Sequence, residues 1–205
     1  LQAAKVNGVK RVVYSSTSAS YGLKNNSPVT EDMPTDCLNA YSITKCSGEE
    51  LCKMFNKMYD IETVILRYFN VYGERQPVKG QYAPVIGLFL RQYEEGDPMT
   101  VVGDGLQRRD FTHVSDVVEA NIKAARTKDV EVLGEIFNIG TGTNYSIFDL
   151  VRMIGGEEAK FKHIPPREAE VKNSKANIGK ARYLLEWKPD VNLKDWIKSC
   201  KKQLA

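Results

Sequence analysis

The sequence predicts an α/β fold built on a parallel sheet with helices on both faces. Apolar runs of strand length occur at residues 10–15, 63–69 and 135–139. The run at 63–69 is rich in β-branched residues and has apolar residues on both faces, as strands buried on both faces do. Helical stretches separate these runs, and residues 39–60 form the longest of them. Strands that alternate with helices are typical of parallel α/β sheets.

The N-terminal part predicts a helix end, a strand, a loop and a long helix. Residues 1–7 have the pattern of a last helical turn, closed by an Asn-Gly pair. Residues 24–38 are rich in Asn, Ser, Pro, Thr and Asp, which is typical of a loop. Asn39 is predicted to cap a helix that runs to about Asp60. The apolar face predicted for this helix comprises Ile43, Leu51, Met54, Phe55 and Met58.

Capping residues mark two later helix starts. Ser115 is predicted to cap a helix that runs to about Thr127. Ser146 and Asp149 have capping-box spacing for a helix that ends at Ile154. The remaining predicted elements are a helix at 85–95, strands at 99–102 and 161–164, and helices at 178–186 and 193–204.

Composition narrows the class of protein. Hydrophobic residues make up 42% and charged residues 27% of the 205 residues, which is ordinary for a globular protein. The net charge of +3 is too small to favour a nucleic-acid or membrane partner. No two of the four cysteines form a C-x-x-C pair and only two histidines occur, so we expect no metal site. Reduced thiols indicate a cytoplasmic location.

Polar residues follow several predicted strands. Such sheets bind ligands at the carboxyl ends of their strands. Residues 15–17, Asn70 and Asn138 lie at these ends. Tyr41 and Lys45 lie one helical turn apart on one helix face, where a lysine charge favours a phenolate that can act as a general base. Taken singly, these residues also suit purely structural roles, such as the capping of a turn by Asn70.

Six motifs run in order along nearly the whole chain. They are Ser15-Ser16-Thr17-Ser18-Ala19-Ser20-Tyr21-Gly22, Tyr41-x-x-x-Lys45, Leu66-Arg67-Tyr68-Phe69-Asn70-Val71-Tyr72-Gly73, Gly103-Asp104-Gly105, Arg108-Arg109-Asp110-Phe111-Thr112-His113-Val114 and Phe137-Asn138-Ile139-Gly140. Together they resemble the extended short-chain dehydrogenase/reductase family. Within it they are most like the nucleotide-sugar epimerase/dehydratase branch, and the UDP-glucose 4-epimerases in particular.

The resemblance implies the C-terminal part of a Rossmann-like doubly wound parallel sheet plus a small α+β substrate-binding domain. Residues 1–75 and 104–142 would form a partial NAD-binding domain that carries the catalytic residues. Residues 76–103 and 143–205 would bind the nucleotide sugar.

The resemblance also implies a nucleotide-sugar 4-epimerase that uses NAD. Tyr41 as phenolate would remove the proton of the sugar 4-hydroxyl while NAD takes a hydride from C4. Thr17 would hold that hydroxyl and help to relay the proton. Lys45 would bind the nicotinamide ribose, and Ser15 and Tyr68 would contact NAD. The 4-keto sugar would turn over in the site, and hydride would return to its other face.

Substrate contacts carry over by position. Asn70, Arg109 and Arg167 would bind the diphosphate, for which guanidinium groups are suited. The remaining expected contacts are Gln81 and Tyr82 near the nucleotide, Thr100 and Val102 beside the uracil, Glu170 near the ribose, and Ser174 at the sugar.

Two positions narrow the reaction and the substrates that the resemblance implies. Ala19 stands where the dehydratases and decarboxylases of this branch carry an acidic residue, which favours epimerisation. Ser174 stands where a bulky tyrosine excludes N-acetylated sugars, so we expect UDP-N-acetylglucosamine to be accepted along with UDP-glucose.

The glycine-rich turn that holds the NAD pyrophosphate in this family is not found in the sequence. We therefore expect weak NAD binding, an inactive isolated chain, and an open sheet edge at residues 11–15. The chain could be a non-catalytic fragment that binds a UDP-sugar, or a split half whose partner carries the missing N-terminal half. Another sugar-nucleotide oxidoreductase is a further alternative. A homodimer through helices 1–7 and 39–60 is expected as well.

Overall fold

A three-stranded parallel sheet forms the centre of the N-terminal part. The computed structural model describes residues 1–80 and 83–204. The strand order is β1-β2-β6, formed by β1 (Arg11–Thr17), β2 (Glu62–Tyr68) and β6 (Ile136–Ile139). Both pairings are parallel, as the alternation of strands and helices predicted. Among the described residues β1 pairs only with β2.

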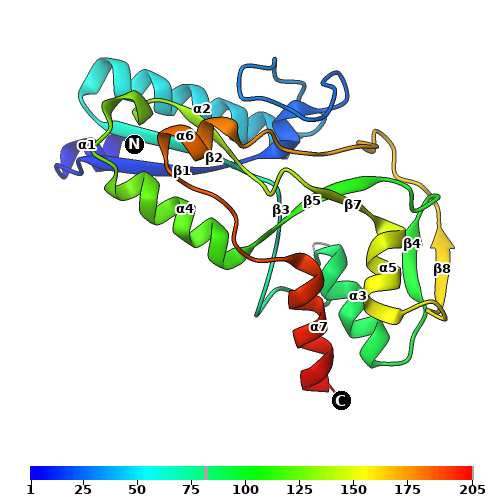
Figure 1. The fold of residues 1–205 in the computed structure, drawn as a ribbon. Helices are drawn as coiled ribbons and strands as arrows, with labels where there is room; N and C mark the ends of the chain where they lie inside the picture. Colours follow the sequence, from blue (N-terminus) through cyan, green and yellow to red (C-terminus); the bar gives the residue numbers. More distant parts are fainter. Residues whose placement is uncertain (81–82, 205) are drawn as a thin grey trace.

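Helices cover both faces of this sheet. Figure 1 shows α2 (Ala40–Tyr59) and α4 (Val114–Arg126) on opposite sides of β1 and β2. Cys52 of α2 packs against Ile65, whereas α4 and α6 (Gly179–Leu184) pack on the face that carries Leu66. Successive β2 side chains thus enter different cores, because side chains alternate across a strand. Two-faced burial explains why most of this strand is apolar, with Arg67 as a buried exception.

A second group of elements lies beside this sheet in Figure 1 and has its own core. A sheet of order β3-β5-β7 joins the two groups; its strands are β3 (Asn70–Tyr72), β5 (Arg108–His113) and β7 (Asn144–Ser146). A parallel pair is formed by β4 (Met99–Val102) and β8 (Phe161–Ile164). The helices here are α3 (Val85–Glu94), α5 (Ile147–Gly155) and α7 (Leu193–Leu204), and the short elements elsewhere are α1 (Gln2–Val6), η1 (Ser18–Tyr21) and η2 (Val130–Val132).

Two of the three predicted helix caps are confirmed. Asn39 caps α2 in a capping box with Ser42, and Ser146 caps α5 in a capping box with Asp149. The cap predicted at Ser115 is wrong, because α4 begins at Val114 and its cap is His113. The Nδ1 atom of His113 accepts a hydrogen bond from the Ser115 backbone N–H, so an imidazole takes the place of the expected hydroxyl.

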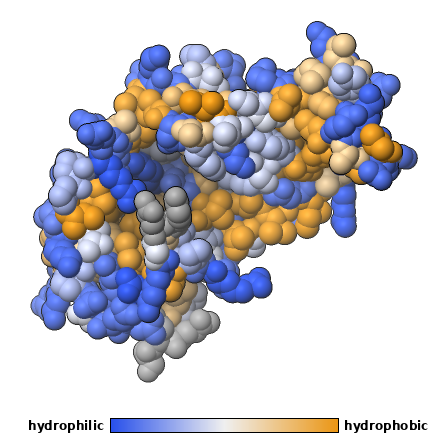
Figure 2. Space-filling view, turned by 180° about the vertical axis from the view of Figure 1, so that it is seen from behind, coloured by the Kyte–Doolittle hydropathy of each residue, from blue (hydrophilic) through white to orange (hydrophobic). Residues whose placement is uncertain are grey.

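The apolar face predicted for α2 is largely wrong. Phe55 is buried, but Ile43, Leu51, Met54 and Met58 are exposed. The side that meets the sheet instead carries Ser42, Glu49 and Cys52. Large hydrophobic areas reach the surface on the face shown in Figure 2. No helix in the described ranges combines the length and apolar character needed to cross a membrane.

Gly48 lies where α2 packs against the Tyr14 side chain of β1. A Cβ atom built on Gly48 would overlap the hydroxyl of Tyr14. Only glycine leaves room for this side chain against the helix. This packing brings the α2 side chains within reach of the β1 backbone.

Candidate active site

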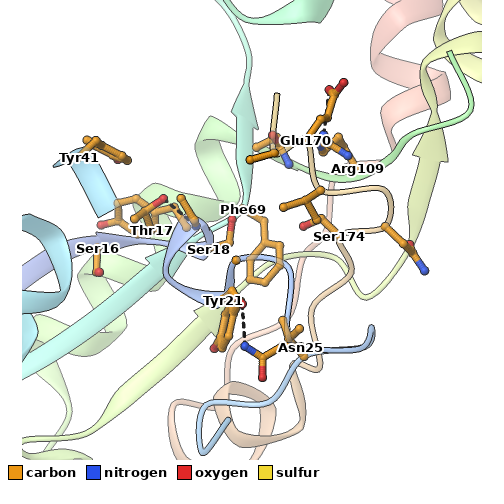
Figure 3. Close-up of a pocket in the computed structure, with 18 of the residues that line it drawn as sticks. Ser16, Thr17, Ser18, Tyr21, Asn25, Tyr41, Phe69, Arg109, Glu170 and Ser174 are labelled. Carbon is orange, nitrogen blue, oxygen red and sulfur yellow. Dashed lines mark hydrogen bonds and ion pairs between the residues drawn. The ribbon is translucent and has the colours of Figure 1, made fainter. Parts of the chain in front are cut away.

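A cavity of about 510 Å³ opens where β1 and β2 end. Figure 3 shows Tyr41 and Thr17 at one side of it, Arg109 and Glu170 at the other, and Phe69 between them. Eight of the residues expected to act in binding or catalysis line this cavity: Thr17, Tyr41, Tyr68, Asn70, Arg109, Arg167, Glu170 and Ser174. Segments far apart in sequence thus meet in one site.

Thr17 is the last residue of β1 and caps the short helix η1. Its Oγ1 accepts a hydrogen bond of 3.1 Å from the backbone N–H of Ala19. The Ser20 hydroxyl donates to the Thr17 carbonyl at 2.9 Å. These bonds hold a buried hydroxyl at the cavity wall.

Tyr41 stands in the first turn of α2 with 54% of its surface exposed. The Lys45 Nζ atom lies 5.9 Å from the centre of the Tyr41 ring. The same ammonium donates a 2.8 Å hydrogen bond to the Ser15 carbonyl. Lys45 therefore places a positive charge near Tyr41 and ties α2 to β1.

Ser15 and Tyr68 lie on adjacent strands beside this lysine. The Ser15 Oγ and the Tyr68 hydroxyl are 3.1 Å apart, and the Tyr68 hydroxyl donates to Asn121 Oδ1 of α4 at 3.0 Å. Ser15 and Lys45 do not line the cavity itself. They extend its polar wall along the ends of β1 and β2.

The opposite wall carries two guanidinium groups. Arg109 Nη2 lies 3.1 Å from Glu170 Oε1, and its Nη1 donates to the Arg108 carbonyl at 3.0 Å. Burial lowers the pKa of Arg109, against the opposing effect of Glu170, and the charge of Arg167 lowers it further. A half-buried guanidinium beside a second cation is suited to a group with several negative charges.

Asn70 and Asp110 connect this wall to the sheet. The Asn70 side-chain amide donates to the Asp110 carbonyl at 3.0 Å. The Asp110 carboxylate is fully buried and accepts bonds from the backbone N–H groups of Thr141, Gly142 and Ala176. Burial raises the pKa of Asp110, and these hydrogen bonds oppose the rise. Asp110 thereby anchors the segment that follows Ser174, a role that its motif did not indicate.

Two expected substrate residues in the described part of the chain, Thr100 and Val102, do not line this cavity. Thr100 and Val102 lie on β4, where the Thr100 backbone N–H donates to Gln92 Oε1 and the Val102 carbonyl accepts from Gln107. A neighbouring cavity of about 960 Å³ lies next to them and shares Arg167 and Glu170 with the first cavity. Gln81 and Tyr82 lie outside the described residues.

The sequence analysis missed a buried ion pair beneath the cavity. Glu49 of α2 accepts two bonds from Arg67 of β2, at 2.8 Å from Nε and 2.6 Å from Nη2. The Ser16 hydroxyl also donates to Glu49. One signal was available, because Glu49 continues the spacing of Tyr41 and Lys45 along one helix face.

Comparison with known proteins identifies relatives of this chain. A sequence model of the NAD dependent epimerase/dehydratase family matches residues 1–140. A putative UDP-glucose 4-epimerase from Methanocaldococcus jannaschii is 42% identical over 192 residues, which cover 92% of this chain and 61% of that protein. The chain thus spans about three fifths of the length of this curated relative.

Two of the solved structures of similar fold are those of epimerases. A UDP-N-acetylglucosamine 4-epimerase from Methanobrevibacter ruminantium matches with a TM-score of 0.90 at 31% identity, over 98% of this chain and 64% of that one. A UDP-glucuronic acid 4-epimerase from Bacillus cereus, in complex with UDP-glucuronic acid and NAD, matches with a TM-score of 0.87 at 36% identity, over 100% of this chain and 65% of that one.

Proposed function

The chain belongs to the NAD dependent epimerase/dehydratase family, and from this membership we propose that it carries the catalytic and substrate-binding residues of a nucleotide-sugar 4-epimerase. One observation supports the proposal most directly. Tyr41 and Thr17 lie on one wall of the cavity, and Arg109 lies on the other. A UDP-sugar has its reacting hydroxyl group at one end and its diphosphate in the middle, which fits this division.

In the proposed reaction Tyr41 as phenolate accepts the proton of the sugar 4-hydroxyl. Thr17 accepts or donates a hydrogen bond at the same hydroxyl, because its Oγ1 is held at the cavity wall. The Lys45 ammonium stands 5.9 Å from the centre of the Tyr41 ring, beside the proposed base. Arg109, Arg167 and the Asn70 amide bind the diphosphate.

NAD, when bound, supplies the group that takes a hydride from C4 and returns it. The residues at the ends of β1 and β2 fit such a cofactor. The Lys45 ammonium uses one of its three donors on Ser15, which leaves two for a ribose. The hydroxyls of Ser15 and Tyr68 lie side by side next to it. Tyr41, Lys45, Ser15 and Tyr68 would thus hold the nicotinamide end.

The proposed reaction is tested in the full-length gene product with NAD and UDP-glucose. We expect UDP-galactose to appear, followed by proton NMR, with no net change in nicotinamide redox state. Accumulation of reduced nicotinamide in proportion to an oxidised sugar would instead indicate an oxidoreductase. A 4-keto-6-deoxy sugar formed without net nicotinamide reduction would indicate a dehydratase. Ala19 favours epimerisation, because no carboxylate stands at that position of the wall.

We further propose that the site accepts UDP-N-acetylglucosamine. Ser174 lines the cavity with a small side chain, and its backbone N–H is fixed on the Arg108 carbonyl at 3.0 Å. A similar structure is that of a UDP-N-acetylglucosamine 4-epimerase, which supports the idea. Ser174→Tyr should abolish turnover of the acetylated sugar and spare UDP-glucose. Equal loss of both activities, or no loss, would contradict this assignment.

A second candidate is a chain that binds a UDP-sugar but needs another polypeptide to bind NAD. The unpaired side of β1 among the described residues favours this reading, because an open sheet edge can pair with another chain. Calorimetric titration of the 205-residue chain with UDP and with NAD separates the candidates. Binding of UDP without NAD favours the partner reading, and epimerisation by this chain alone excludes it.

A homodimer through α1 and α2 is also proposed. Ile43, Leu51, Met54 and Met58 of α2 are exposed, and burial of such side chains against a second copy removes apolar surface from water. Leu51→Glu should shift the sedimentation coefficient to that of a monomer. An unchanged coefficient would place the interface elsewhere.

A further inference from the structure

The ion pair between Glu49 and Arg67 is among the most deeply buried polar groups of the chain. The two side chains are 1% and 2% exposed. Burial alone would lower the pKa of Arg67, but its bonds to Glu49 and the nearby Tyr21 leave that pKa raised. The Arg67 guanidinium therefore remains charged at neutral pH.

A buried ion pair is weak evidence for stability. Removing two charges from water costs several kcal/mol per ion, and a well-packed apolar pair of similar volume often stabilises a fold equally well. The geometry of this pair is more informative than its energy, because hydrogen bonds fix direction and distance where apolar contacts allow sliding.

The pair connects the elements that carry the candidate catalytic residues. Through Ser16 it contacts β1 between Ser15, whose carbonyl binds Lys45, and Thr17. Arg67 belongs to β2 and directly precedes Tyr68. The Tyr21 ring of η1 lies 4.7 Å from the guanidinium carbon.

Helical spacing places this contact directly behind Tyr41. Glu49 follows Lys45 by one turn and Tyr41 by two turns on the same helix face. Lys45 attaches α2 to β1 through its ammonium and through its carbonyl, which accepts from the Tyr14 hydroxyl at 3.4 Å, and Glu49 attaches it one turn later. Further along the helix, the Cys52 carbonyl accepts from the Thr63 hydroxyl of β2 at 3.0 Å. Glu49 is the buried attachment between these two, so it limits rotation and sliding of the helix in the turns that follow Tyr41.

We propose that the Glu49–Arg67 pair is a positioning unit that holds the first turns of α2 in register with β1, so that Tyr41 and Thr17 meet the same substrate hydroxyl. The inference rests on the proposed function for its effect on turnover. It adds two residues that touch neither substrate nor cofactor and act through Tyr41.

The test compares variants of the full-length gene product. Glu49→Gln leaves Arg67 charged, buried and unpaired, and this variant is expected to fold poorly. The informative variant is therefore the double change Glu49→Leu with Arg67→Met, which removes both charges at similar volume. We expect a folded protein whose kcat falls roughly 10–100-fold, because displacement of a reacting group by about 1 Å can cost that much. KM should stay within about twofold, since the diphosphate contacts are untouched.

Two further variants separate positioning from stability. Glu49→Asp keeps the charge with a shorter reach, and its kcat should lie between those of the wild type and the double variant. Asp116→Asn is the matched control, because Asp116 is also a buried carboxylate and binds the backbone N–H groups of Asp190 and Val191 from α4, on the opposite face of the sheet from α2. It should lower stability and leave kcat unchanged. Wild-type kcat in the folded double variant would overturn the proposal.

A readout without turnover keeps the inference independent of the proposed reaction. Amide hydrogen exchange across residues 41–48 should accelerate in the double variant and not in Asp116→Asn, at equal global stability. Unchanged exchange there would overturn the positioning role even in an active enzyme. A wild-type protein without epimerase activity, but with the expected exchange, would refute only the proposed function.

Discussion

The two walls of the cavity are built differently. The wall with Thr17 and Tyr41 stands on β1 and α2, which Lys45, Glu49 and Arg67 hold together through backbone and buried bonds. The wall with Arg109 depends on a segment without regular structure around Glu170, and its ion pair is partly exposed. Proton transfer needs a fixed geometry, whereas binding of a flexible diphosphate tolerates adjustment. The regular wall therefore suits chemistry and the irregular wall suits recognition.

The largest effect is expected on the regular wall. Tyr41→Phe removes the proposed base and should lower kcat roughly 10²–10⁴-fold with little change in KM. Steady-state kinetics of the full-length gene product measure both constants. Tyr59→Phe at the other end of α2 is the control and should retain activity. A large KM effect from Tyr41→Phe would contradict the assignment of chemistry to one wall and of substrate binding to the other.

The next effect is expected on the irregular wall. Arg109→Met removes a charged donor and should weaken UDP binding about 10–100-fold, since hydrogen bonds to charged groups contribute about 1.5–3 kcal/mol. Calorimetric titration with UDP measures the loss. Arg11→Met is the matched control, because Arg11 pairs with Glu62 at 2.7 Å at the other end of β1. A loss of kcat with unchanged affinity would assign Arg109 to the chemistry.

Asp110 tests whether the irregular wall depends on one anchor. In Asp110→Asn the new amide group would face the N–H groups of Gly142 or Ala176, so we expect a loss of about 2 kcal/mol in unfolding free energy. Urea unfolding measures this loss. KM for the UDP-sugar should rise and kcat should change little. An equal loss of kcat would show that the two walls move together.

The smallest effect concerns Tyr21, which lies under the cavity. Burial raises the pKa of Tyr21 from 10.0 to about 12. The neutral phenol is therefore favoured by folding, and its contribution is full below pH 10 and is lost as the pH rises towards 12. Near pH 11 the loss should be about 1 kcal/mol, from 1.36 kcal/mol per pKa unit. Tyr21→Phe should flatten stability over this range, and an identical pH slope would contradict the assignment.

The sheet at the centre was predictable because its strands are apolar by local pattern. The burial of residues 63–69 was predictable from their own pattern, without knowing which elements pack against them. The strands β5 and β7 were not predicted, since Arg108 and Arg109 make half of β5 polar and its partner strand lies far along the chain. Their pairing is a property of the tertiary fold.

The clustering of the expected site residues in one cavity was predictable where motifs carried them. Thr17, Tyr41 and Arg109 were expected to act together, and the fold brings them to one cavity. The pairing of Glu49 with Arg67 was not predicted, because a carboxylate on a helix and an arginine in a strand reveal no contact until the helix docks. The exposed Ile43 and Leu51 misled the choice of the buried face for the same reason.

Gly48 has a consequence for how this helix can vary. Its lack of a side chain leaves room for Tyr14 of β1, because a Cβ atom there would meet the Tyr14 hydroxyl. That hydroxyl donates to the Lys45 carbonyl at 3.4 Å. An added methyl group would displace the hydroxyl from this bond, in the helical turn whose lysine binds the Ser15 carbonyl. The missing side chain at Gly48 thus keeps one contact between α2 and β1 in place.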